Sequence, residues 1–407
     1  MRGWRAPRIL TENPMRILVH HRIASRDGQS VHLEELVDAL RCKGHTVLLV
    51  GPSSFTEVVF GASVNSVDFL KRLIPKPLFE CMELAYNLIA FQRLYRAVRR
   101  FKPDVIYERF SLFLWCGVWA SRAFDIPLLL EVNSPLYEER LATGALSLKL
   151  VGRWSQKWLF CRATTILPVT EALAQVVRDY GARREQIFVI PNGVNTKHFQ
   201  LCVDTEAAKK KIGLSSRLVV GFVGFVREWN AVHKLVRFAS TYKGRFDVHI
   251  LIVGDGPARA SIETHAQELG IADRVTITGV IARDRVADWL SAIDVAVLPA
   301  VTWYSSPLKM FEYMELSRAI IAPDLPNIRE ILEDGVNAVL FSDREGELEH
   351  ALERLCDDDD LRIRIGRNAH ETIRSRELTW DGNASRISKI AQTLVEQRVA
   401  QQAQSRV

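Results

Sequence analysis

The sequence predicts an α/β protein with two doubly wound domains, each a parallel sheet between layers of helices. Its 407 residues are too many for one ordinary domain and suit two. Both halves show the same sequence pattern: an apolar run is followed by a turn, an amphipathic helix and a second apolar run. Most of these runs are continuously apolar, which is typical of strands covered on both faces of a parallel sheet.

The first half predicts one Rossmann-like unit. A β-rich run at 16–20 and a polar loop precede an amphipathic helix that ends before Gly44, after two basic residues. The apolar face of this helix carries Val31, Leu33, Leu36, Val37 and Leu40. A strand at 46–50 completes a βαβ unit. Further elements are expected as strands at 105–107, 127–132, 165–168 and 187–190, and as a buried helix at 110–120.

The second half restarts the same order after a turn-rich hinge at 191–203. Its expected strands are 218–223, 248–253, 275–278, 295–298 and 319–322. Beyond Asp343 the pattern is mostly helical, and the Gln-rich residues after Gln397 show no pattern. The expected division is a flexible leader at 1–14, a first domain at 15–192, a second domain at 193–380, and a C-terminal helix and tail at 381–407 that can cross back to the first domain. Tandem domains of this class place a ligand in a cleft, at the carboxyl ends of their strands.

Composition excludes several classes of protein. Hydrophobic residues make up 48% and charged residues 25% of the chain, as in globular domains. The six cysteines are dispersed and form no C-x-x-C pair, which argues against a disulfide scaffold or a zinc ribbon. No uninterrupted run of 18 apolar residues predicts a transmembrane helix.

Positive charge is concentrated in the first half. Residues 1–200 hold 27 Lys and Arg against 18 Asp and Glu, whereas the remainder holds 27 against 30. Such an excess suits nucleic acid, an anionic membrane or a phosphorylated substrate, or else it forms a solvated basic surface without a partner. Nucleic acid is disfavoured, because the basic residues accompany no recognisable binding motif. Segment 69–101 mixes apolar with basic residues, and it predicts either a peripheral membrane contact or a buried helix pair with basic edges.

Two of three motifs suggest ligand chemistry, although each of these two also has a purely structural interpretation. Residues 253–257 (VGDGP) place glycines at a strand-to-helix turn, where the backbone can approach an anion. Residues 190–199 (IPNGVNTKHF) form a sharp turn. In 305–312 (SSPLKMFE), a helix start places Lys309 near an anion, and Glu312 lies on the same helix face. A carboxylate there can accept hydrogen bonds from sugar hydroxyls, or the two residues can form an ordinary surface ion pair.

In order and spacing, these segments resemble family 4 of the retaining glycosyltransferases, which have the GT-B fold of two Rossmann-like domains. The resemblance covers roughly residues 15–388. It is carried by IPNGVN at 190–195, FVG at 222–224, LIVGDGP at 251–257, TGVI at 278–281 and SPLKMFEYM at 306–314. Three N-terminal segments, ILVHHR at 17–22, DVIYER at 104–109 and LEVNSP at 130–135, resemble members that build bacterial surface polysaccharides.

The resemblance implies a donor site. The family signature consists of two Glu residues separated by seven others. Glu312 matches the second Glu, which binds the nucleotide ribose in relatives. Tyr304 stands in place of the first Glu. Relatives bind the diphosphate with an Arg and a Lys that follow the FVG strand. The resemblance therefore implies that Arg227 binds the diphosphate. Asn230 stands in place of the Lys, and Lys309 is expected to supply the second positive charge. The implied donor-binding residues are Gly28, Gly224, Arg227, Gly254, Gly256, Gly279, Val280, Tyr304, Ser306, Pro307, Leu308, Lys309 and Glu312.

The resemblance also implies an acceptor side in the first domain. Asn133 matches a position where many relatives carry a His near the reacting sugar, and it joins Arg227 and Lys309 as an expected catalytic residue. Strand-end residues facing a cleft are natural site residues, or else helix caps and loop salt bridges. The expected acceptor-side residues are Asp27, Gly28, Glu108, Arg109, Glu131 and Asn133.

The implied activity is transfer of a sugar from a nucleotide-diphosphate donor to an acceptor hydroxyl, with retention of configuration. The resemblance implies a nucleotide sugar and a glycan or lipid-linked acceptor as partners, no metal and no cofactor beyond the donor. We expect a cytoplasmic protein, with a possible peripheral contact of the basic first domain on the inner membrane face. A nucleotide-sugar epimerase and a catalytically lapsed scaffold of the same fold stay open as alternatives.

Overall fold

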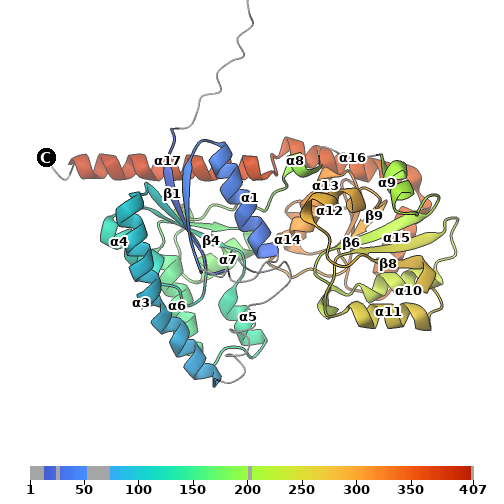
Figure 1. The fold of residues 1–407 in the computed structure, drawn as a ribbon, viewed down its shortest axis with the longest axis horizontal. Coiled ribbons are helices and arrows are strands. Elements are labelled where there is room, and N and C mark those ends of the chain that lie inside the picture. Colours follow the sequence, from blue (N-terminus) through green and yellow to red (C-terminus); the bar gives the residue numbers. More distant parts are fainter. Residues whose placement is uncertain (1–12, 24–27, 53–73, 200–203, 405–407) are drawn as a thin grey trace, which may run out of the picture. The chain divides into compact units, whose positions relative to one another are not determined.

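The computed structural model describes residues 13–23, 28–52, 74–199 and 204–404, and two compact units divide the chain (Figure 1). Unit 1 comprises residues 1–191 and 380–407, and unit 2 comprises 192–379. The chain therefore leaves unit 1 after Pro191 and returns to it at Trp380.

Unit 1 is a parallel five-stranded sheet with the order β2-β1-β3-β4-β5. Its strands are β1 (Arg16–His20), β2 (Thr46–Val50), β3 (Val105–Arg109), β4 (Leu128–Val132) and β5 (Thr165–Pro168). Its helices are α1 (Gly28–Cys42), α3 (Lys76–Phe101), α4 (Cys116–Phe124), α5 (Leu136–Ala142), α6 (Lys149–Arg162), α7 (Glu171–Asp179) and α17 (Trp380–Gln404). The strand order changes direction between β1 and β3, and ligand sites of doubly wound folds form at such a switch point.

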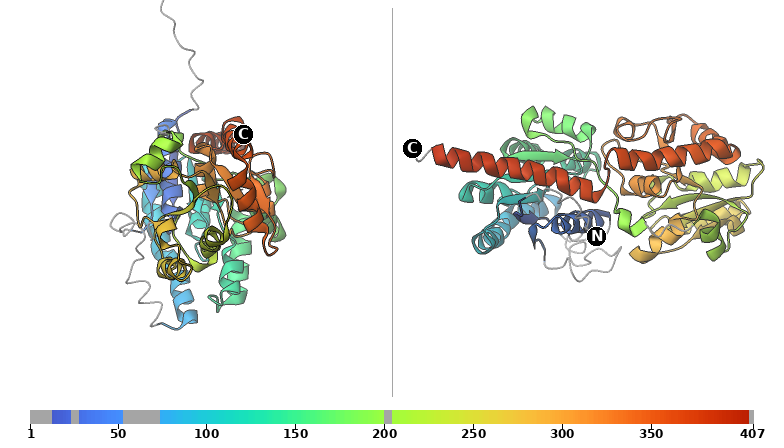
Figure 2. Two further views of the ribbon diagram at one scale, coloured as in Figure 1. Left: turned by 90° about the vertical axis from the view of Figure 1, so that its right-hand side faces the viewer. Right: turned by 90° about the horizontal axis from the view of Figure 1, so that it is seen from above.

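Helix α17 belongs to unit 1 because it packs on α1 (Figure 2). The His45 ring lies 2.7 Å from Ser388 Oγ, and Lys43 Nζ lies 2.9 Å from Asp381 Oδ2. At the start of α17, the Asn383 amide donates to the Pro191 carbonyl across 2.7 Å. These contacts hold the returning segment of the chain beside the point where it left.

Unit 2 is a parallel six-stranded sheet with the order β11-β10-β9-β6-β7-β8. Its strands are β6 (Leu218–Val223), β7 (Val248–Val253), β8 (Val275–Ile277), β9 (Val295–Val297), β10 (Ala319–Pro323) and β11 (Val339–Phe341). Its helices are α8 (Thr196–Phe199), α9 (Thr205–Lys211), α10 (His233–Thr241), α11 (Arg259–Glu268), α12 (Arg283–Leu290), α13 (Leu308–Glu315), α14 (Pro326–Arg329), α15 (Glu347–Asp357) and α16 (Asp359–Ser375). The switch point lies between β6 and β9.

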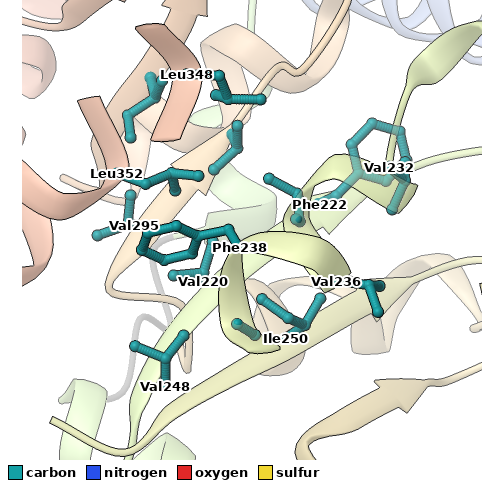
Figure 3. Packing of buried hydrophobic residues seen from close by; sticks show 14 of the residues in the cluster. Val220, Phe222, Val232, Val236, Phe238, Val248, Ile250, Val295, Leu348 and Leu352 are labelled. Atoms are coloured by element: carbon teal, nitrogen blue, oxygen red, sulfur yellow. The ribbon is translucent and has the colours of Figure 1, made fainter. Parts of the chain in front are cut away.

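Fully buried side chains explain why unit 2 forms these layers. On one face of its sheet, Phe222 and Ile250 from two strands meet Phe238 of α10 and Leu352 of α15 (Figure 3). Because successive strand residues point to opposite faces, continuously apolar strands supply a core on each side. The predicted fold class is thus confirmed. Within the described ranges, no helix is both long enough and apolar enough to cross a membrane.

Two predicted elements of unit 1 were wrong. The expected strand at 187–190 lies along β5 and donates two backbone hydrogen bonds to it, but Pro168 has no N–H with which to continue the ladder. The expected helix at 110–120 starts only at Cys116, where the Asn87 side chain of α3 accepts the N–H of Trp115 across 2.6 Å.

Three further details differ from the sequence pattern. Strand β11 was not expected, because three residues give little pattern. Helix α17 continues through the Gln-rich residues as far as Gln404. In α1 the expected apolar Val31 is only half-buried, whereas His32 and Glu35 are buried. The Glu35 and His32 positions are therefore inside unit 1 despite their polarity.

Candidate functional site

Two glycine turns follow β6 and β7 in unit 2. Gly224 and Gly254 have φ angles of 132° and 141°, which side-chain-bearing residues rarely adopt. A Cβ on Gly254 would lie 2.1 Å from the Gly224 carbonyl oxygen, and one on Gly256 would lie 2.2 Å from the Val226 carbonyl oxygen. The glycines therefore allow the two strand ends to approach each other backbone to backbone.

Lys309 lies against the first of these turns. It is the second residue of α13, and its Nζ lies 3.8 Å from the centroid of the Phe222 ring on β6. A Cβ on Gly224 would lie only 2.8 Å from Nζ, so glycine leaves room for the ammonium group. Burial lowers the pKa of Lys309 to about 7, although the nearby Glu312 carboxylate acts to raise it. A second negative group at this position would restore the charge on Lys309.

Glu312 follows Lys309 one turn later in α13 and is half-buried. The helix is fixed to β6 by Tyr313, whose phenolic oxygen accepts the backbone N–H of Val223 across 2.9 Å. Burial raises the pKa of this phenol. Lys309 and Glu312 therefore project from a helix whose place against the β6 turn is set by a buried hydrogen bond.

The segment before α13 is ordered by amide side chains. Asn192 donates its backbone N–H to Ser306 Oγ across 3.1 Å and its side-chain amide to the Ser306 carbonyl across 2.6 Å. Asn327 donates its side-chain amide to the carbonyls of Thr302 and Ser305. Pro307 then precedes Leu308, the first helical residue. Tyr304, in the same segment, makes an edge-on contact with the Trp303 ring.

Three further predicted donor residues of unit 2, Arg227, Gly279 and Val280, lie on loops that follow strands. Arg227 is exposed on the loop after β6, with its guanidinium 5.0 Å from the Phe225 ring centroid. The Asn230 side chain accepts a hydrogen bond from the Arg227 backbone N–H across 2.8 Å. Asn230, which stands in place of the family's Lys, therefore stabilises the turn after β6. Gly279 has a φ of 72° and precedes the exposed Val280.

In unit 1, polar side chains gather at the carboxyl ends of β1, β3 and β4. His20 Nδ1 lies 2.5 Å from Glu108 Oε2, and both residues are buried. Gly117 makes this possible, because a Cβ there would lie 2.1 Å from the Glu108 carboxylate. The ligand atoms of His20, Glu108 and Cys116 lie within 4.8 Å of one another, the one such grouping that the described ranges form. A hydrogen-bonded acid and imidazole account for this trio without a metal, and the prediction of no metal stays a prediction.

A second buried pair lies next to it. His32 of α1 hydrogen-bonds Glu131 at the end of β4, and its ring meets the Trp380 ring edge-on at 4.8 Å. Burial alone would raise the pKa of Glu131, but His32 and Arg109 outweigh it and hold that pKa at about 2. Glu131 is therefore a buried carboxylate that stays ionised at neutral pH.

Three atoms at this edge are buried without a hydrogen-bond partner in the described part of the chain. They are Arg109 Nη1, Glu131 Oε2 and Asn133 Nδ2. Arg109 Nη1 and Glu131 Oε2 lie 3.5 Å apart, which is close enough for charge attraction but long for a hydrogen bond. Unpaired buried donors are rare in folded proteins, and a bound polar ligand is one way of satisfying them.

The predicted residues thus fall into two groups, one in each unit. In unit 2, contacts join Gly224, Gly254 and Lys309, with Glu312 on the same helix as Lys309; in unit 1, Glu108, Arg109, Glu131 and Asn133 gather at one sheet edge. Gly28 is the first residue of α1, and Asp27 lies outside the described residues. The roles assigned to all of them stay predictions.

His20 and His32 were missed from the sequence. His20 is the polar last residue of a strand and follows three apolar residues, and this pattern is a usable signal for a strand-end site residue. His32 could not have been found in this way, because its partner Glu131 is 99 residues distant.

Two family models match the chain, one on each half. Residues 26–198 match the model described as Glycosyltransferase Family 4, and residues 217–358 match that described as Glycosyl transferases group 1. Together they include the ends of β3 and β4 in unit 1 and both glycine turns of unit 2, whereas β1 with His20 precedes the first match.

Individual relatives agree with these models. The chain is 27% identical to an alpha-D-kanosaminyltransferase of Streptomyces kanamyceticus over 61% of its own length and 66% of that protein. It is 23% identical to an alpha-monoglucosyldiacylglycerol synthase of Streptococcus pneumoniae over 77% of its own length and 72% of that protein. A solved structure of Anabaena HepE in complex with UDP superposes with a TM-score of 0.71 and 18% identity, covering 93% of this chain and 100% of that one.

Proposed function

Because this chain belongs to the glycosyltransferases of the GT-B superfamily, we propose that it transfers a sugar from a nucleotide-diphosphate donor to an acceptor hydroxyl, with retention of configuration. The observation that carries the proposal is the position of Lys309. It places an amine beside the Gly224 turn, at the start of a helix and at the carboxyl ends of two parallel strands. Such a place suits a diphosphate.

The donor's diphosphate is the leaving group, so the main task of unit 2 is to stabilise negative charge. Lys309 takes up a proton as the diphosphate binds, because a nearby anion raises its pKa from about 7. The N-terminal N–H groups of α13 and the Arg227 guanidinium add positive potential. Fixed charges of this kind lower the barrier because they need not reorganise during the reaction.

Glu312 is proposed to bind the ribose of the nucleotide. Its carboxylate can accept hydrogen bonds from two neighbouring hydroxyls, and Tyr313 holds its helix in register with β6. Tyr304 offers one hydroxyl toward the donor sugar in place of the missing carboxylate. HepE was solved with UDP, so UDP is the first nucleotide to test.

The acceptor is proposed to bind at the polar edge of unit 1. Asn133 and Arg109 each have a buried N–H group available there, and the ionised Glu131 can accept a hydroxyl proton in a hydrogen bond. A glycan or a lipid-linked sugar has the hydroxyls that this set recognises. The diacylglycerol relative supports a lipid-linked acceptor, and we place the reaction in the cytoplasm, at the inner membrane face.

A nucleotide-dependent shift in melting temperature tests the donor site. UDP should stabilise the chain, because a ligand that binds only the folded state raises its stability. Glu312→Gln should reduce the shift strongly. Glu315→Gln, which changes a half-buried carboxylate later in the same helix, is the matched control and should preserve it. An unchanged shift in Glu312→Gln would refute the ribose role.

Nucleotide release separates this activity from the alternatives. A transferase releases UDP from a UDP-sugar quickly only when an acceptor is present. Conversion of the sugar without an acceptor would instead identify an epimerase. A chain that binds UDP but neither converts nor transfers any sugar in a donor and acceptor panel would be a lapsed scaffold.

A further inference from the structure

The first half of α3 is inverted, with polar residues inside and apolar residues outside. Its inward positions include Glu80, Glu83 and Asn87, all of them buried. Its outward positions hold Leu78 and Leu88, which are 55% and 70% exposed, with Met82 and Ile89 beside them. A helix on a globular protein ordinarily shows the opposite arrangement.

The buried polar residues are all used within unit 1. Glu80 accepts the backbone N–H groups of Ser147 and Leu148, across 2.7 and 2.6 Å. Glu83 receives two hydrogen bonds from the Arg140 guanidinium, at 2.8 and 3.1 Å. These contacts fix the rotation of α3, so the exposure of its apolar side chains is set by the fold.

The same contacts join α6 to the buried side of α3. Glu80 holds the two residues just before α6, and Asn87 holds Trp115, whose ring meets the Trp154 ring edge-on at 5.4 Å. On α6, Leu150 and Trp154 are 86% and 52% exposed. Figure 1 shows the start of α3 extending beyond the sheet together with α5 and α6. We refer to the exposed apolar side chains of these two helices together as the α3–α6 face; they are Leu78, Met82, Leu88, Ile89, Leu150 and Trp154.

Its charge is of one sign. Helix α3 carries five basic residues and α6 four, whereas the only acidic residues of the two helices are the buried Glu80 and Glu83. The basic residues of α3 lie mostly at its end, so the outward side of the helix passes from apolar to basic. They are Lys76, Arg93, Arg96, Arg99 and Arg100, and those of α6 are Lys149, Arg153, Lys157 and Arg162.

We propose that the α3–α6 face docks on an anionic lipid bilayer. The apolar side chains enter the boundary between head groups and acyl chains, and the arginines meet lipid phosphates. A second copy of the chain suits this face poorly, because a two-fold contact would bring together basic residues with no acid opposite them. The bilayer supplies both the apolar layer and the missing negative charge.

The position of the α3–α6 face suggests a function for membrane docking, and this function rests on the proposed transfer to a lipid-linked acceptor. Arg22, two residues beyond β1, lies 3.4 Å from Glu83 and over the Tyr86 ring of α3. The apolar half of α3 is thus at the carboxyl end of β1, on the sheet edge that carries His20, Glu108 and Glu131. A sugar attached to a lipid in the docked bilayer would present its hydroxyls to that edge.

The sequence had left this segment open between a membrane contact and a buried helix pair with basic edges. Residues 69–73 of it lie outside the described residues. Of the apolar residues in the described part of this segment, Leu78, Leu88 and Ile89 are exposed, whereas Ile74, Phe79 and Phe91 are half-buried.

Vesicle sedimentation of the full chain tests the proposal. The chain should sediment with vesicles that contain phosphatidylglycerol, and less at high salt or with phosphatidylcholine alone. Leu88→Glu and Leu150→Glu should each weaken binding about tenfold or more, and Arg96→Glu about fivefold or more. The matched control is Ile363→Glu, at an exposed apolar position on α16 of unit 2, which should bind like the unaltered chain. Circular dichroism checks that each variant is folded.

Three results would overturn the proposal. One is recovery of the unaltered chain in the supernatant at low salt with phosphatidylglycerol vesicles. Another is equal binding by folded Leu88→Glu. The third is a dimer in light scattering that Leu88→Glu dissociates, which would assign the face to self-association. The UDP melting shift is measured without vesicles, so failure of the proposed transfer and failure of the docking proposal are separate results.

Discussion

Lys309 must satisfy two opposing requirements, stability of the fold and binding of an anion. Its pKa is about 7 in the folded chain and 10.5 ordinarily, because burial disfavours the ammonium form. Below pH 7 both folded and unfolded chains carry this charge, and the fold bears its full desolvation cost. Between pH 7 and 10.5 the unfolded chain binds more protons, so the contribution of this group to stability rises with pH.

Lys309→Met should therefore separate stability from activity. The free energy of unfolding should increase at pH 6, and its rise between pH 7 and 10 should flatten, while sugar transfer should fall by about 10²-fold. Denaturant unfolding at several pH values and a UDP-release assay measure the two effects. Lys210→Met, at an exposed lysine of α9, should change neither. Full activity in Lys309→Met would remove the basis of the donor site.

Glu131 has the opposite pH dependence. Its pKa is lowered from 4.5 to about 2, so its stabilising effect is fully present above pH 4.5 and is lost as the pH falls toward 2. Glu131→Gln should lower the free energy of unfolding by about 3 kcal/mol at pH 7, since it leaves His32 and Arg109 without their buried partner. The difference from the unaltered chain should shrink between pH 4.5 and 3 in urea titrations. Glu185→Gln, an exposed change, should have no effect, and an equal loss at pH 7 and 3 would contradict the role of charge.

At the scale of elements, the two glycine turns of unit 2 depend on close backbone packing. Gly254→Ala adds both an unfavourable φ and a clash with the Gly224 carbonyl oxygen, so it should destabilise the chain by about 3 kcal/mol. Gly270→Ala is the comparison: it has a φ of 67° but open space around its Cβ, and should cost only about 1 kcal/mol. Chemical denaturation measures both. If Gly254→Ala and Gly270→Ala lowered the free energy of unfolding equally, the turn would tolerate movement of the β6 and β7 ends.

How far the sequence predicts these elements depends on where their partners lie. Strand β6 was predicted with its bounds, because a continuous apolar run needs no information beyond itself. The start of α4 was not, since its cap comes from Asn87 on another helix. The outward face of α3 was also beyond prediction. Its buried Glu80 and Glu83 look like surface residues until their partners at 140 and 147–148 are brought together by the fold.

The same distinction applies to the candidate site. The motif around Lys309 and Glu312 is local, and one helix supplies it. The edge of unit 1 is assembled from strand ends far apart in the chain, so the sequence indicated Glu131 and Asn133 but gave no sign of the His32 partner. Short local motifs can therefore be found from sequence, whereas networks of buried polar residues need the fold.

At the scale of the whole molecule, unit 2 is an insertion within unit 1. The two ends of unit 2 meet, because the Val194 backbone N–H donates a hydrogen bond to the Leu378 carbonyl. In unit 1, the Asn383 side chain likewise donates a hydrogen bond to the Pro191 carbonyl. Helix α17 covers α1 and supplies the Trp380 ring that meets His32.

This arrangement has a consequence for synthesis on the ribosome. Chains are made from the N-terminus, and domains fold as units once their residues have emerged. Unit 2 is complete when residue 379 has left the ribosome, whereas unit 1 waits for α17. The sheet of unit 1 is therefore translated before unit 2 but reaches its final packing after it, and α1 stays uncovered until α17 has emerged.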